Sequence, residues 1–218
     1  NMRLIMDGVF NHTSDQHSWF QSALDPHNSH HDWYHWAKEK PNNWSSVFGG
    51  AAWTKHPENG LYYLHSFSKE QPDLNWANPE VRDAVHEVMS FWLDKGVSGF
   101  RLDVFNCYAK DPERRSNPTH SAWWKRAAGV VYPYIGQNHI HDRDVPELHG
   151  YLRELRDLVN GHDAILVGET LDESFVYDKA ADYVSGTALH MAFNFRLLHS
   201  RWDAGEIQSA ITSYLDGL

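Results

Sequence analysis

A short stretch that combines strand-like apolar residues with two charges constrains this chain most. Residues 97–104 read Val-Ser-Gly-Phe-Arg-Leu-Asp-Val, an apolar run that predicts a buried parallel strand. Arg101 and Asp103 interrupt the run, and the period of two places both side chains on one face, where their charges can pair. One interpretation is an ion pair that only holds the strand in place. The other is a functional site, because sites in parallel α/β folds lie at the carboxyl ends of strands.

Composition limits the classes of protein that fit these 218 residues. The chain is 41% hydrophobic and 22% charged, which suits a globular α/β protein, and no run is apolar enough to cross a bilayer. The formal net charge of −10 disfavours nucleic acid as a partner, because nucleic-acid-binding surfaces are basic. An acidic chain with 10 Trp and 10 Tyr suits a neutral ligand such as a sugar. Cys107, the single cysteine, suits a reducing compartment, so we expect a cytoplasmic protein.

Two further apolar segments carry a functional side chain within or at the end of a predicted strand. Residues 3–10 form one such strand, with Asp7 inside it and His12 just beyond it. Residues 164–169 form the other, which closes on Glu169. Because the carboxyl ends of parallel strands meet at one edge of a sheet, these side chains are expected near Arg101 and Asp103.

Helix signals between these strands indicate a parallel sheet. Asn78-Pro79-Glu80 provides an N-cap and a proline at the first helical position, and apolar residues then recur at helical spacing. A second helix is predicted within residues 146–161 and a terminal one over 204–215, while residues 188–195 predict a fourth strand. Alternating strands and helices imply a parallel sheet with right-handed crossovers.

Residues 13–75 break this alternation. Turn signals such as Gly49-Gly50 and Asn59-Gly60 separate short aromatic segments, of which residues 61–65 predict a strand. An irregular loop of this length is improbable within a compact domain. We therefore predict a small subdomain inserted after the first strand.

Two of the strand ends would bring a pair of carboxylates together. If the strands of Asp103 and Glu169 are neighbours, their spacing places the two carboxyl groups about 5 Å apart. That separation is typical of retaining glycosidases, in which one carboxylate is the nucleophile and the other the general acid/base. Arg101 would keep Asp103 ionised, while Glu169 in drier surroundings would hold its proton. The alternatives are a divalent-metal site or a structural carboxylate cluster, and the arginine argues against metal because it supplies positive charge itself.

Four motifs in a defined order resemble the signature regions of the α-amylase family, glycoside hydrolase family 13. They are Asp7–His12, Gln71–Asn75, Gly99–Asp103 and Val167–Thr170. The second motif has the form typical of the oligo-1,6-glucosidase and α-glucosidase branch. The resemblance covers essentially the whole chain.

The fold implied by the resemblance is α/β, a partial (β/α)8 TIM barrel from about strand 3 to strand 6 with an inserted domain B. Residues 1–12 would then be barrel strand 3, residues 13–75 domain B, and residues 76–218 the barrel continuation from helix 3 to helix 6. Family members have two earlier barrel strands and a later Asn-His-Asp motif that this sequence lacks. We therefore expect a piece of a longer enzyme, inactive on its own.

The resemblance also implies roles for the residues that match the motifs. Asp103 is expected to be the nucleophile, Glu169 the general acid/base and Arg101 the partner of the nucleophile. His12 would bind hydroxyl groups of the glucose that is cleaved off. Asp7 would hold the residues that contact the substrate in position without touching the substrate itself.

Three more residues are candidate substrate contacts. Val104 follows Asp103 directly, and a branched side chain there narrows the space beside the scissile bond. Valine at this position resembles the α-1,6-cleaving branch. Phe48 and Phe67 are candidates for stacking on the next sugar, with ordinary loop-core packing as the alternative. Histidines in residues 27–35 have spacings that zinc could use, but a loop without cysteines favours a polar aromatic surface, so no metal ligand is assigned.

The function implied is that of a retaining glycosidase that releases glucose from short α-glucosides, with α-1,6-linked isomalto-oligosaccharides preferred. The alternatives are an α-1,4-glucosidase, a sucrose- or trehalose-type hydrolase and a glucosyl-transferring isomerase. A catalytically inactive binding subunit, like the heavy chains of some amino-acid transporters, is the non-enzymatic alternative, and intact Asp103, Glu169 and Arg101 argue against it. We expect an oligosaccharide or disaccharide substrate, no nucleic acid, no membrane and no cofactor in this chain, with a structural calcium elsewhere in the full-length enzyme compatible with the family.

Overall fold

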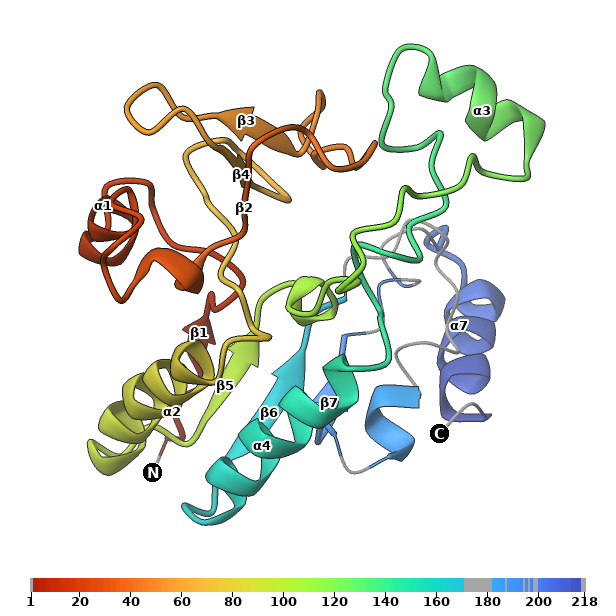
Figure 1. Cartoon of the computed structure of the whole chain (residues 1–218). Helices are drawn as coiled ribbons and strands as arrows, with labels where there is room; N and C mark the ends of the chain where they lie inside the picture. Colours follow the sequence, from red (N-terminus) through yellow and green to blue (C-terminus); the bar gives the residue numbers. More distant parts are fainter. Residues whose placement is uncertain are drawn as a thin grey trace. The chain divides into compact units, whose positions relative to one another are not determined.

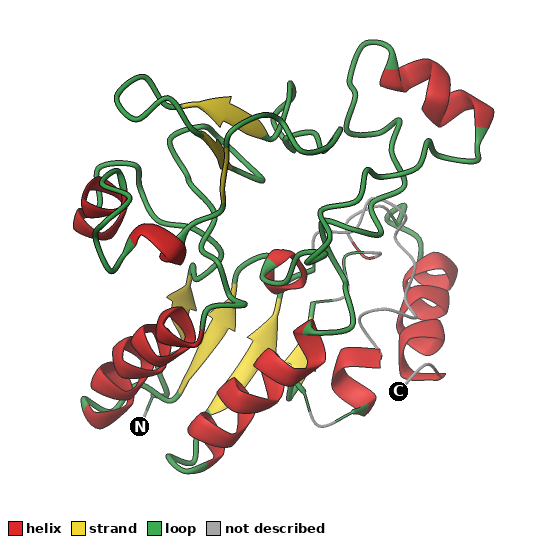
Figure 2. Ribbon diagram, in the orientation of Figure 1, coloured by secondary structure: helices red, strands yellow, loops and turns green. Residues whose placement is uncertain are grey.

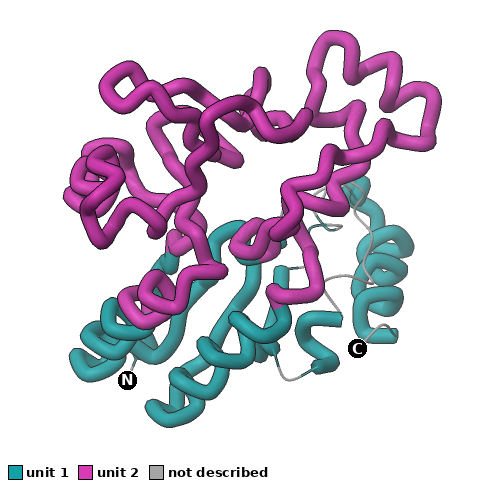
Figure 3. Tube along the Cα trace, in the orientation of Figure 1, with its two compact units in different colours: residues 1–8, 86–105, 149–218 teal, residues 9–85, 106–148 magenta. Residues whose placement is uncertain are grey.

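Two compact units make up the chain (Figure 3). The first comprises residues 1–8, 86–105 and 149–218, and the second comprises residues 9–85 and 106–148. Each unit therefore joins segments that are far apart in the sequence. The computed structural model describes residues 2–170, 182–186, 188–193, 195, 197 and 200–216.

The first unit is built on a parallel sheet with strand order β1-β5-β6-β7 in the described part of the chain (Figures 1 and 2). The strands are β1 (Met6–Gly8), β5 (Gly99–Leu102), β6 (Ile165–Gly168) and β7 (Met191–Ala192). Leu102 pairs with Gly8 on one side and with Gly168 on the other. The predicted parallel sheet is confirmed, and the strands that precede Asp103 and Glu169 are neighbours.

The strands are shorter than the apolar runs that predicted them. Residues 3–10 contribute only the three residues of β1, and Leu4 and Ile5 are largely exposed. The predicted strand over residues 188–195 pairs only at Met191–Ala192, and Asn194 lies outside the described residues. Because β5 and β6 are only four residues long, apolar residues beyond their ends have no neighbouring strand to pair with.

The helices begin where the sequence signals place them. Helix α2 (Pro79–Asp94) is capped by Asn78, whose Oδ1 accepts a hydrogen bond of 3.0 Å from the Glu80 N–H. Helix α4 (Leu148–Asn160) buries a stripe at helical spacing that consists of Leu148, Leu152, Leu155 and Val159. These two helices run beside each other in Figure 1, and His86 of α2 lies 4.0 Å from Glu154 of α4.

The last helix, α7 (Ala204–Asp216), is attached to the edge of the sheet by a hydrogen bond. The Tyr214 hydroxyl donates to the main-chain oxygen of Ala192 in β7 at 3.0 Å. The bounds of α7 confirm the helix predicted over residues 204–215. No helix in the described residues is both long enough and apolar enough to span a membrane.

Two glycines allow close packing around β5 and β6. Gly99 has φ +156°, and a Cβ there would lie 2.3 Å from the main-chain oxygen of Ile165. A Cβ on Gly168 would lie 2.5 Å from both the Phe105 ring and the Leu189 side chain. A larger residue at Gly99 would therefore push β5 away from β6, and one at Gly168 would displace the side chains of Phe105 and Leu189.

The second unit contains a small antiparallel sheet with strand order β2-β4-β3. Its strands are β2 (Trp36–Ala37), β3 (Trp53–Lys55) and β4 (Tyr62–Leu64), and β4 confirms the strand predicted over residues 61–65. The chain also has the short helices α1 (Ser18–Ala23), η1 (His31–Trp33), η2 (Phe105–Cys107) and α3 (Trp123–Gly129). Its core includes a cluster of Trp44, Ala52, Trp53 and Leu64. Large aromatic side chains thus supply the packing that these short strands cannot.

Candidate functional site

Four of the predicted site residues meet in the first unit, at and just beyond the carboxyl ends of its strands. Arg101 Nη1 lies 2.5 Å from Asp7 Oδ1, and its Nη2 lies 3.0 Å from Asp103 Oδ1. The same Nη2 also contacts Glu169 Oε2. One guanidinium therefore joins carboxylates that three different strands deliver.

The backbone ladder positions these side chains. Asp7 lies opposite Arg101 in the β1–β5 register, so their side chains share a face of the sheet. The Asp103 N–H donates to the Gly8 oxygen at 3.1 Å, and the Glu169 N–H donates to the Leu102 oxygen at 3.0 Å. Both acidic residues are thus tied to the neighbouring strand just where the sheet ends.

The two acidic side chains at the strand ends converge on one nitrogen atom of Arg101. Asp103 Oδ1 and Glu169 Oε2 both contact Arg101 Nη2, and the spacing of their neighbouring strands predicts carboxyl groups about 5 Å apart. The shared nitrogen keeps the two carboxyl groups next to each other. Two neighbouring carboxyl groups disfavour ionisation of both.

Glu169 is the carboxyl group of this site whose pKa is raised. Burial above all, together with the neighbouring Asp103 carboxyl group, raises the pKa of Glu169 to about 7 against the opposing charge of Arg101. The two acidic side chains are each 22% exposed. Glu169 therefore keeps its proton up to about neutral pH, as a general acid requires.

Val104, directly after Asp103, has an unusual backbone conformation. Its φ is +40°, a left-handed value that is rare for a β-branched residue, and its side chain is 8% exposed. The turn at Val104 leads into Phe105, whose ring packs on Gly168, one residue before Glu169. The ring also meets Tyr183 edge-on at 4.9 Å. Phe105 thereby links the end of β5 to the end of β6.

The other three predicted site residues form a second cluster, in the second unit. The ring centroids of His12 and Phe67 are 5.5 Å apart, and those of Phe67 and Phe48 are 5.9 Å apart. Phe67 is buried, whereas Phe48 is 70% exposed. Gln71 Nε2 lies 2.8 Å from His12 Nε2 and fixes the orientation of the imidazole ring. An exposed aromatic ring beside a held histidine is a surface on which a sugar can stack.

A buried ion pair supports this second cluster, and sequence reasoning missed half of it. Asp73 is 0% exposed and accepts hydrogen bonds from Asn11 Nδ2 (3.1 Å), the Ser66 N–H (2.8 Å) and Ser66 Oγ (2.5 Å). Lys110 Nζ lies 3.1 Å from its Oδ2. Asn11 Nδ2 is also 3.3 Å from His12 Nδ1, so Asp73 holds the residue that touches His12. The only sequence signal for Lys110 is a charge directly after the apolar pair Tyr108-Ala109.

Hydrogen bonds and the ion pair keep both charges of this pair despite burial. Burial opposes ionisation, yet Lys110 and the Ser66 donors hold the pKa of Asp73 below its ordinary value. Burial likewise acts against the charge of Lys110, and Asp73 raises the pKa of that amine above its ordinary value. Each charge thus depends on the other.

The histidines of residues 27–35 have packing roles in the second unit. His30 Nδ1 lies 2.9 Å from Ser22 Oγ, and His31 Nδ1 lies 2.7 Å from the Ala23 oxygen. Within the described residues, no three His, Cys, Asp or Glu side chains gather as metal ligands would. These ring nitrogens instead connect α1 to η1.

We expect Lys110→Met to destabilise the protein by about 3–5 kcal/mol, because it leaves the Asp73 carboxylate buried without its cation. Urea unfolding of the full-length protein measures the loss. Lys69→Met is the matched control, since Lys69 is exposed and its change should cost less than about 0.5 kcal/mol. Asp73→Asn added to Lys110→Met should recover part of the stability, and equal losses for the two lysine variants would contradict the role of the pair.

Comparisons with known proteins agree with this geometry. The family model described as "Alpha amylase, catalytic domain" matches residues 1–215. The oligo-1,6-glucosidase of Parageobacillus thermoglucosidasius is 42% identical over 94% of this chain and 35% of its own length. The chain thus spans little more than a third of that curated relative.

Solved structures show the same fold. An alpha-glucosyl transfer enzyme, XgtA, superposes with a TM-score of 0.89 at 36% identity, over 100% of this chain and 42% of that one. An isomaltulose synthase from Erwinia rhapontici NX5, solved with its natural substrate sucrose, superposes with a TM-score of 0.79 at 33% identity, over 98% and 39% of the two chains. The chain belongs to the α-amylase family and forms part of its catalytic domain.

Proposed function

We propose that the protein carrying this chain is a retaining glycosidase that releases glucose from short α-glucosides, with α-1,6 linkages preferred. The observation that carries the proposal is the pair of carboxyl groups at the ends of β5 and β6 beside a shared arginine, with the pKa of Glu169 raised to about 7. On this proposal the parallel sheet corresponds to barrel strands 3 to 6, and residues 13–75 are domain B. Soluble sugars bound by relatives support a disaccharide or oligosaccharide as substrate.

In the proposed reaction, Asp103 attacks the anomeric carbon while Glu169 donates its proton to the departing glycosidic oxygen. Arg101 holds Asp103 Oδ1, which leaves Oδ2 to form the new bond. Glu169, now ionised, then takes a proton from water, and the resulting hydroxide displaces the glucose from Asp103. Both groups return to their starting states, so the cycle is balanced.

A second candidate is glucosyl transfer, in which a sugar hydroxyl replaces water in the second step. The similarity to a solved alpha-glucosyl transfer enzyme favours this alternative. The first step would be unchanged, so Asp103 and Glu169 keep the same roles. Product analysis at high sugar concentration separates the two, because transfer yields longer or isomeric sugars and hydrolysis yields free glucose.

Asp103→Ala in the full-length enzyme should lower kcat by several orders of magnitude and leave the fold intact, because it removes only the nucleophile. Added azide should restore part of the activity on an activated aryl glucoside and give a glucosyl azide of inverted configuration. Circular dichroism before and after the change controls for folding. Near-normal turnover by the variant would remove Asp103 from the mechanism.

The pKa of about 7 for Glu169 predicts that kcat/KM falls as pH rises through about 7, because the general acid loses its proton. Glu169→Gln should remove this alkaline limb and slow natural disaccharides far more than activated aryl glucosides, whose leaving groups need no protonation. Equal losses on both substrates would contradict the assignment.

Stability gives a readout of the same proton that does not depend on turnover. The folded pKa of about 7 lies above the ordinary 4.5, so protonation of Glu169 stabilises the fold fully below pH 4.5. This contribution is lost as pH rises through about 7. The Tm of Glu169→Gln relative to the parent should therefore be higher at pH 8 than at pH 5, and a difference that does not change with pH would place the proton elsewhere.

The preference for α-1,6 linkages rests on Val104. An α-1,4 acceptor presents a bulky ring carbon beside the nucleophile, whereas an α-1,6 acceptor presents a slim methylene. Only the edge of Val104 can meet the acceptor, since the side chain is 8% exposed, so the discrimination should be about tenfold to a hundredfold. Val104→Ala should raise kcat/KM for maltose relative to isomaltose, and a parent enzyme that favours maltose would overturn the preference.

A further inference from the structure

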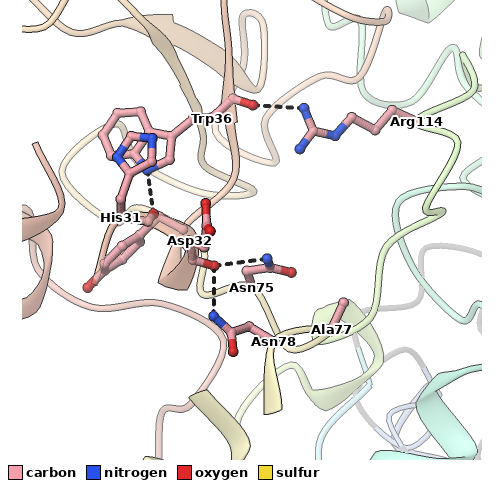
Figure 4. Close-up of a pocket in the computed structure, with 8 residues that line it drawn as sticks. His31, Asp32, Trp36, Asn75, Ala77, Asn78 and Arg114 are labelled. Carbon is pink, nitrogen blue, oxygen red and sulfur yellow. Dashed lines mark hydrogen bonds between the residues drawn. The ribbon is translucent and has the colours of Figure 1, made fainter. Parts of the chain in front are cut away.

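The second unit contains a polar pocket that the proposed catalytic residues do not use (Figure 4). Its cavity volume is about 610 Å³. The lining residues come from η1, β2, the segment before α2 and the loop after η2, and they are His31, Asp32, Tyr34, Trp36, Asn75, Ala77, Asn78 and Arg114. This volume falls in the range of small-molecule sites.

One wall of the pocket carries a half-buried guanidinium without an acidic partner. Arg114 Nη1 donates to the Trp36 main-chain oxygen at 2.8 Å, and its guanidinium lies 5.4 Å from the centre of the Trp53 ring. Within the described residues, no carboxylate pairs with it, and burial lowers its pKa. Arg114 also has a left-handed φ of +52°. Half-buried cations are normally paired, so the remaining N–H groups of Arg114 are available to a ligand.

A carboxylate on the floor of the pocket is also available. Asp32 is exposed, and its main-chain oxygen is held by the side-chain amides of Asn75 (3.0 Å) and Asn78 (3.3 Å). No described residue donates a hydrogen bond to its carboxylate. The backbone of Asp32 is therefore fixed while its side chain stays free to accept hydrogen bonds from a ligand.

Stacked rings make the wall opposite Arg114 rigid. The rings of His31 and Trp36 are parallel within 2° at 5.3 Å, and Trp36 also stacks on Phe20 at 5.6 Å. The Trp36 indole N–H donates to the His31 oxygen at 2.8 Å. Figure 4 shows the Asp32 side chain between this stack and Arg114. A preformed wall lowers the entropy that a ligand loses on binding.

We propose that this pocket is a second, non-catalytic carbohydrate-binding site. The Asp32 carboxylate would repel an anionic ligand, and the Arg114 guanidinium would repel a cationic ligand. An apolar ligand would leave both groups without hydrogen bonds. A neutral sugar satisfies both, because its hydroxyl groups accept from Arg114 and donate to Asp32 at the same time. The proposal concerns binding alone and does not require that the protein hydrolyse the same sugar.

Stoichiometry in titration calorimetry tests the site. The full-length protein with Asp103→Ala, which cannot turn over sugar, is titrated with isomaltotriose and should bind two equivalents. Arg114→Met and, separately, Asp32→Ala should weaken one of them at least about tenfold, since each removes a hydrogen bond to a charged group. Ala77→Phe, which fills the pocket from an exposed position, should abolish the same equivalent. Arg126→Met, an exposed arginine on α3, is the matched control and should bind two.

Two other outcomes of the titration would overturn the proposal. A single equivalent in every variant would mean that the pocket takes no sugar, for instance because another part of the longer protein fills it. Displacement of isomaltotriose by inorganic phosphate would mean an anion site. Asp32→Ala guards against misfolding as the cause, because Arg114 contacts Trp36 and Trp53 whereas the Asp32 carboxylate has no described partner. Failure of the glucosidase proposal alone would appear as lack of turnover in the parent enzyme and as a single equivalent of isomaltotriose, which Arg114→Met, Asp32→Ala and Ala77→Phe weaken or abolish and Arg126→Met retains.

Discussion

The contacts between the Arg101 guanidinium and three carboxyl groups determine the electrostatics of the site in the first unit. Asp7, Asp103 and Glu169 each contact it, and each comes from a different strand or strand end. A single positive charge does not balance three negative ones, so the surplus of carboxyl groups opposes ionisation of each of them. At Glu169 burial adds the largest effect, and its pKa rises to about 7. Burial and the crowding of carboxyl groups at the sheet edge thus act in the same direction on Glu169.

The second unit holds a buried carboxyl group, Asp73, whose pKa is shifted in the opposite direction to that of Glu169. Asp73 is buried more completely than Glu169, yet its pKa is lowered, because Lys110 and three further hydrogen-bond donors face its carboxylate. Burial alone therefore does not decide the charge of a carboxyl group; the ratio of donors to acceptors does. The Asp73 site stays ionised and rigid, as a support requires, whereas the shared site at Arg101 keeps a proton that can move.

The sequence predicted the paired charges of the first unit but not the buried ion pair of the second. Period-two spacing put Arg101 and Asp103 on one face, and strand and helix alternation made the strands of Asp103 and Glu169 neighbours, which the register confirms. Both arguments depend on repeated geometry. Lys110 lies in a segment without a period, and it reaches Asp73 only through a fold in which residues 106–148 join residues 9–85. Such long-range polar pairs leave no local pattern to read.

The backbone at Val104 shows how the ends of β5 and β6 are held together. The chain turns sharply through a left-handed residue directly after Asp103. The turn brings Phe105 onto Gly168, where only a glycine leaves room, and so clamps the two strand ends together just before Glu169. A left-handed β-branched residue costs roughly 1–2 kcal/mol, which packing of the buried Phe105 ring can offset. Strain at one residue and a missing side chain at another thus act together to hold the strand ends that carry Asp103 and Glu169 next to each other.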